Sequence, residues 1–148
     1  MNMQTGAGAP LERYVELMGD LTPERLAEIA GLVSDNVLFR DPFNEVRGRD
    51  RFVAVFQHMF AILKELKFTF EDRASAGRVH FFTWQFSARH AQLGPFTIGG
   101  VSRIETDETG LVVSHIDYWD SDSAFMARIP VLGKPIGWLR KFMELRLS

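Results

Sequence analysis

Two aspartates are the residues in this sequence most able to do chemistry. Asp41 stands before Pro42, and Asp117 follows His115 by two positions. A carboxylate in an apolar pocket can act as a general base, and a nearby imidazole can share its proton or orient a water molecule. Because side chains alternate along a strand, His115, Asp117 and Trp119 would lie on one face. The pattern predicts acid–base chemistry if that face lines a pocket.

Both aspartates also have a simpler structural interpretation. An aspartate before proline commonly accepts hydrogen bonds from nearby backbone amides in a turn, which would account for Asp41. The face that carries Asp117 could point to solvent, in which case the core would be formed by Val112, Ile116 and Tyr118. The sequence leaves these alternatives open.

Tyr14 and His58 are further candidates. Tyr14 falls on the apolar stripe of a predicted first helix, where a core tyrosine with a satisfied hydroxyl is the alternative to a catalytic donor. His58 lies on a long predicted helix, where a packing histidine is the alternative. The four histidines form no local ligand motif and the chain has no cysteine, so we expect neither a metal nor an organic cofactor.

Helices and then strands must position these residues. Apolar spacing predicts helices over residues 11–18, 21–33, 49–66 and 134–147, with Thr22 as the N-cap of the second. Alternating patterns predict strands over 36–42, 67–76, 78–90, 94–106 and 111–120. Sequential strands are typical of an antiparallel meander, so the fold class is α+β with the helices on one face of the sheet. Gly99 and Gly100, inside a strand, indicate a bend, a bulge or a close backbone approach.

Length, charge and composition exclude several classes of protein. The chain has 148 residues, 46% of them hydrophobic, which is enough for one domain with its own core. We expect a disordered segment over 1–9 and a single domain over 10–148. A net charge of −2 predicts no nucleic-acid partner. No apolar run approaches the roughly 20 residues of a membrane span, and no signal peptide is evident, so we expect a cytoplasmic protein without membrane association.

In the order of its elements the chain resembles the nuclear transport factor 2-like superfamily, and most of all its SnoaL-like and ketosteroid-isomerase-like branch. The resemblance spans about residues 10–125. It includes two local patterns, Asp41-Pro42 after the first strand and Gly48-Arg49-Asp50 at the start of the long helix. It implies a cone, in which a strongly curved antiparallel sheet wraps around the long helix and encloses an apolar pocket.

Two enzyme types within this superfamily imply different roles for the candidates. Arg13-Tyr14-Val15 is similar to a ketosteroid-isomerase motif, in which Tyr14 would stabilise an oxyanion while Asp41 moves a proton. The third residue of that set falls at Gly100. Ile116–Asp120 is similar to the last strand of limonene epoxide hydrolase, in which Asp117 would activate a water molecule.

The epoxide-hydrolase alignment also raises a question about one strand. It places the partners of Asp117 at Gln85 and Ser87 and so turns those two residues into the pocket, whereas burial favours the opposite face, which carries Phe82, Trp84 and Phe86. Both could hold if the aromatic face packs in a dimer interface, because an exposed aromatic stripe of that size would be a liability.

We therefore expect a cofactor-independent enzyme, of the isomerase or lyase type or similar to an epoxide hydrolase, that acts by acid–base catalysis on a small apolar molecule. The alternative is a non-catalytic ligand-binding or dimeric interaction module. The candidate catalytic residues are Asp41, Asp117, Tyr14 and His115. The candidate substrate-binding residues are Phe39, Phe56, His58, Gln85 and Trp119. We expect a homodimer through the outer sheet face and a C-terminal helix that covers the pocket mouth or packs on a partner subunit.

Overall fold

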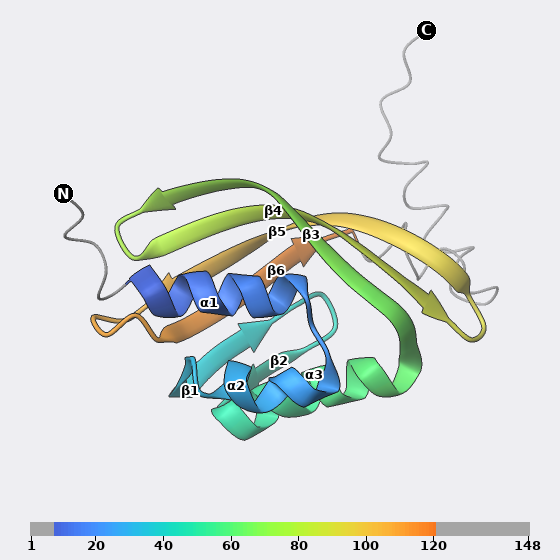
Figure 1. Cartoon of the computed structure of the whole chain (residues 1–148), viewed down its shortest axis with the longest axis horizontal. Helices are drawn as coiled ribbons and strands as arrows, with labels where there is room; N and C mark the ends of the chain where they lie inside the picture. The colour runs from blue at the N-terminus through green and yellow to red at the C-terminus, as the bar shows by residue number, and fades with distance from the viewer. Residues whose placement is uncertain (1–7, 121–148) are drawn as a thin grey trace, which may run out of the picture.

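The computed structural model describes residues 8–120, which form helices packed against one six-stranded sheet (Figure 1). The helices are α1 (Gly8–Gly19), the short 3-10 helix η1 (Pro23–Arg25), α2 (Leu26–Ala30) and α3 (Arg49–Ile62). The strands are β1 (Val33–Arg40), β2 (Glu45–Arg47), β3 (Leu63–Ala76), β4 (Val79–His90), β5 (Gly94–Thr106) and β6 (Val112–Trp119). The predicted α+β class is confirmed.

The sheet is mixed, in the order β2-β1-β6-β5-β4-β3. Strands β3 to β6 form the predicted antiparallel meander, but β1 pairs with β6 in parallel, with Phe39 opposite His115. The expectation of a purely antiparallel sheet is therefore corrected at this one pairing. It brings the end of β1, which leads to Asp41, beside the strand that carries Asp117.

Irregular pairing bends the sheet. The β3–β4 register shifts between Lys64 and Lys67 and again between Phe70 and Arg73, and Glu65 within the first shift has a φ of 55°. An extra residue on one strand kinks it and increases its twist. Figure 1 shows the result, with the long strands arching over α1 while α2 and α3 lie together beside β1.

Several predicted element boundaries are wrong. The long helix ends at Ile62, because Leu63 adopts extended backbone angles and starts β3. The second predicted helix divides into η1 and α2, and Val33 already belongs to β1. Thr22 stands at the N-cap of η1 without a side-chain hydrogen bond there. Strand β2 was not predicted, and the expected helix over 134–147 lies outside the described residues.

The inner face of β4 is aromatic. Phe82, Trp84 and Phe86 are 2%, 2% and 5% exposed, whereas Gln85 is exposed on the other face. Burying large rings removes far more apolar surface from water than burying one amide would, so burial decides the strand's orientation. The predicted inward position of Gln85 is wrong, and the aromatic stripe belongs to the core.

Gly100 makes room for one of these rings. A Cβ built on Gly100 would lie 2.5 Å from the Trp84 ring and 2.9 Å from the Tyr118 carbonyl oxygen. Gly100 pairs with Trp84 on β4 and with Trp119 on β6. The close approach predicted from the glycine pair is therefore present, and it leaves room for the Trp84 indole beside β5.

Candidate functional site

A cavity of about 410 Å³ lies between α3 and the inner face of the sheet. Its wall is largely apolar and includes Phe39, Phe56, Trp84, Phe86 and Trp119. Its polar lining residues are Asp41, Asn44, His58, His90 and Asp117. Phe43 and Ile62 line it and are also 53% and 44% exposed, so these two side chains form its rim. The size and the mixture of apolar walls with few polar groups are typical of small-molecule sites.

A second cavity of about 20 Å³ lies deeper and is lined by Ser102, His115 and Asp117 together with apolar side chains of α1, α3, β3 and β4. That volume suffices for about one water molecule. Asp117, Trp84 and Phe56 line both cavities. Asp117 therefore stands where the large apolar space meets the small polar one.

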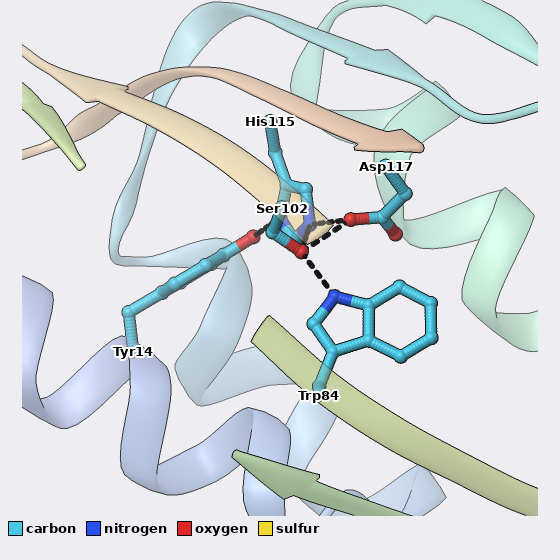
Figure 2. A network of polar contacts seen from close by, with 5 residues as sticks. All are labelled: Tyr14, Trp84, Ser102, His115 and Asp117. Atoms are coloured by element: carbon cyan, nitrogen blue, oxygen red, sulfur yellow. Dashed lines mark hydrogen bonds and ion pairs between the residues drawn. The ribbon is translucent and has the colours of Figure 1, made fainter. Parts of the chain in front are cut away.

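Five buried or half-buried side chains from four elements form one hydrogen-bond network (Figure 2). The Tyr14 hydroxyl on α1 lies 2.6 Å from His115 Nδ1, and His115 Nε2 lies 2.7 Å from Asp117 Oδ1. Ser102 Oγ on β5 lies 2.5 Å from the same carboxylate oxygen, and Trp84 Nε1 donates to Ser102 Oγ at 2.9 Å. The network converges on Asp117.

The protons of this network can be assigned from its donors and acceptors. The Tyr14 hydroxyl has His115 Nδ1 as its hydrogen-bond partner, so it donates there and Nδ1 accepts. His115 is then neutral, with its proton on Nε2, and donates to Asp117 Oδ1. Ser102 accepts from the Trp84 indole and donates to the same oxygen. The protons of His115 and Ser102 both point to Asp117 Oδ1, and those of Tyr14 and Trp84 point to His115 and Ser102.

The buried tyrosine stays protonated. Burial raises the pKa of Tyr14 well above its ordinary value, and the negative charge of Asp117 raises it further. Tyr14 lines neither cavity. Its hydroxyl thus acts on His115 and does not contact a ligand in the larger cavity, which differs from the oxyanion contact implied by the ketosteroid-isomerase resemblance.

Asp41 combines the two interpretations that its sequence context left open. Its Oδ1 accepts the backbone N–H groups of Phe43 at 2.8 Å and of Asn44 at 2.6 Å, as a turn aspartate does. It also lines the larger cavity with Asp117. The turn therefore fixes one carboxylate oxygen and holds the side chain at the cavity wall.

The structure brings most of the predicted residues together. Asp41, Asp117, Phe39, Phe56, His58 and Trp119 line the larger cavity, and His115 lines the smaller one. Gln85 lies on the outer face and lines neither. Sequence reasoning missed Ser102 and the polar role of Trp84. The one signal in the sequence for these two residues was Gly100, because the absence of a side chain there leaves room for the Trp84 indole.

Comparison with known proteins gives the family. Residues 11–115 match the model of the SnoaL-like domain, so the chain belongs to the SnoaL-like domain family. No curated protein matches the sequence. Within the described residues, no helix is long and apolar enough to span a membrane.

Solved structures with the same fold include proteins of several kinds. An NTF2-like protein from Burkholderia thailandensis is 13% identical, with a TM-score of 0.69 over 90% of this chain and 98% of that one. An LEH-like epoxide hydrolase from M. tuberculosis is 15% identical, with a TM-score of 0.65 over 91% and 95%. A steroid delta-isomerase from Pseudomonas aeruginosa is 18% identical, with a TM-score of 0.61 over 97% and 98%. At these identities the likeness shows the fold alone.

Proposed function

We propose that the protein is an acid–base enzyme that transfers a proton to or from a small, mostly apolar molecule, with Asp117 as the general base. The reaction would belong to the isomerase, cyclase, dehydratase or hydrolase type. The proposal takes the larger cavity as the substrate site and needs no cofactor for the proton transfer itself.

One observation carries the proposal, and it concerns the two oxygens of Asp117. Oδ1 accepts from Ser102 and His115, while Oδ2 has no hydrogen-bond partner among residues 8–120. In Figure 2 this second oxygen lies away from the network. The Asp117 side chain is 14% exposed and lines the larger cavity. A carboxylate fixed at one oxygen and open at the other is pre-oriented to take a proton.

The smaller cavity supports the hydrolase type within this group. A water molecule in that space would be within reach of polar groups from Ser102, His115 and Asp117. Asp117 could then deprotonate the water for attack on a substrate in the larger cavity. The epoxide-hydrolase structure with the same fold is consistent with this reaction type.

A second candidate function is non-catalytic ligand binding, and one observation favours it. Stabilisation of a developing oxyanion needs a hydrogen-bond donor aimed into the cavity. Three of the nearby donors are engaged elsewhere, because Tyr14 donates to His115, Trp84 to Ser102 and the Asn44 amide to Asp41. A binding protein has no need of such a donor.

A substrate panel separates the two functions. We expect turnover of an apolar epoxide, enone or β-hydroxy ketone by the wild type, and a loss of at least about a hundredfold in kcat for Asp117→Asn, as is typical when a general base is removed. Glu108→Gln removes one charge outside both cavities and is the matched control. Equal turnover by Asp117→Asn and the control would leave ligand binding as the function.

We also propose a homodimer through the outer sheet face. Phe82, Trp84 and Phe86 of β4 no longer support it, since these three side chains face the core. The support that remains is Phe81 and Tyr118, which are 39% and 50% exposed on the outer face. Tyrosine and phenylalanine are enriched at protein–protein interfaces relative to the rest of a protein surface.

A further inference from the structure

The larger cavity has two carboxylates on its described lining. Its ionisable lining residues are Asp41, Asp117, His58 and His90, and no lysine or arginine is among its described lining residues. His90 accepts two backbone N–H groups of the following turn at Nδ1, so its imidazole is neutral, with its proton on Nε2. Two carboxylates therefore determine which charge a ligand meets in this space.

The apolar wall is of the kind that attracts cations. Seven of the lining residues are phenylalanine or tryptophan. Near the rim, Phe43 and Trp119 meet edge to face with their ring centroids 5.4 Å apart. The face of an aromatic ring carries negative potential and binds ammonium groups, more strongly when water is excluded. The aromatic rings and the two carboxylates thus both favour a cationic ligand.

We infer that the substrate of this cavity is a small, mostly apolar molecule that carries an amino group in addition to its reacting group, bound as the ammonium cation, and that anions of the same shape are excluded. The inference rests on the proposed function, because it takes the same cavity as the substrate site. Charges interact more strongly in a space shielded from water, so the two carboxylates oppose a carboxylate or phosphate ligand there.

The two carboxylates have separate tasks in this arrangement. Asp41 lies two positions before the rim residue Phe43 in sequence, and its Oδ1 is held by the turn. Its Oδ2 has only the Asn44 side-chain amide, at 3.3 Å, as its hydrogen-bond partner among residues 8–120. An ammonium group can replace that long contact with an ion pair. Asp117, which also borders the smaller cavity, stays available to accept the proton.

Three probes with one carbon skeleton test the inference on the full chain. These are 2-phenylethylamine, 2-phenylethanol and phenylacetate, titrated by calorimetry or NMR at pH 8, where free imidazole is neutral and the amine is charged. We expect the amine to bind about tenfold more tightly than the alcohol, and phenylacetate to bind most weakly. Asp41→Asn, which keeps an acceptor for the turn, should remove most of the amine's advantage and leave the alcohol unchanged.

Glu108→Gln, which removes the same charge outside both cavities, is expected to keep the amine preference. The inference is overturned if phenylacetate binds as well as the amine, if the amine binds no better than the alcohol, if Asp41→Asn keeps the preference, or if none of the probes binds. The proposed function is tested separately by turnover in Asp117→Asn, so the two can fail independently.

Discussion

At the scale of single residues, the hydrogen-bond network around Asp117 depends on Tyr14, which lines neither of the two cavities. Tyr14 fixes which nitrogen of His115 is protonated, and that nitrogen then donates to Asp117. A positioning residue of this kind orients another group and stabilises the folded state at the same time. Both effects can be measured without knowledge of the substrate.

The proton assignment predicts a specific histidine spectrum. In ¹⁵N-detected NMR at pH 7 we expect His115 and His90 to show the Nε2–H tautomer, because each accepts a hydrogen bond at Nδ1. His58, which is exposed on α3, is the internal reference for a histidine without such a constraint. A proton on Nδ1 of His115 would contradict the direction of the whole network.

The raised pKa of Tyr14 predicts how stability changes at high pH. Its folded pKa lies above the ordinary value of 10.0, so its contribution is complete below pH 10 and is lost as the pH rises above that value. Between pH 8 and 10.5 the wild type should lose about 0.8 kcal/mol more unfolding free energy than Tyr14→Phe in urea titrations. Tyr118→Phe, at the only other tyrosine, is the control and should follow the wild type. An equal loss in Tyr14→Phe and the wild type would show that Tyr14 ionises normally.

At the scale of elements, β5 shows how a strand's backbone shapes the site. Gly100 allows the Trp84 ring to lie against β5, and the indole then reaches Ser102 at 2.9 Å. Any side chain at Gly100 would collide with that ring and with the Tyr118 carbonyl group. The hydrogen bond from Ser102 to Asp117 therefore depends on the absence of a side chain at Gly100.

Gly100→Ala should consequently be destabilising, by about 1–3 kcal/mol, because an overpacked site must shift rings or backbone. It should also change the fluorescence of Trp84. Gly99→Ala is the neighbouring control, since its Cβ would meet only the exposed Gln85 side chain, at 3.1 Å from Nε2. Urea unfolding of both variants measures the difference, and equal losses would argue against the proposed close packing.

Elements with a strong local pattern could be predicted from the sequence. The four meander strands and the common face of His115, Asp117 and Trp119 follow from alternation, whereas the end of α3 does not. Leu63 and Leu66 fit helical spacing as well as they fit a strand, so only the structure shows where the helix stops. The parallel pairing of β1 with β6 joins segments far apart in the chain and leaves no local signal.

The candidate site, like the fold, could be predicted from the sequence only in part. Aspartates beside proline or histidine stand out by type and spacing, but their partners do not. Tyr14 and His115 are 101 positions apart, and no short pattern connects them. For Gln85 the family alignment and the burial pattern conflict, and the exposed position of this side chain shows that packing of the aromatic rings decides which face of β4 turns inward.

At the scale of the whole molecule, the outer sheet face is the surface through which we propose that two copies associate. Tyr118 is half exposed there and contacts Arg40 at 3.3 Å. If two copies pair through this face, sedimentation equilibrium should give a dimer for the wild type and a monomer for Tyr118→Glu, because removing a carboxylate from water on association is costly. Ala91→Glu, in the exposed turn after β4, adds the same charge and should remain dimeric. A monomeric wild type would contradict the proposal.

The link between Tyr14 and His115 also has a consequence for synthesis at the ribosome. The helix that carries Tyr14 emerges early, but its partner is made 101 residues later, a delay of roughly 5–20 seconds at ordinary translation rates. During that interval the Tyr14 hydroxyl lacks its buried hydrogen-bond partner, although α1 can already contact β3. The last described strand therefore completes the candidate site and the core in the same step, so a chain truncated before β6 should lack both.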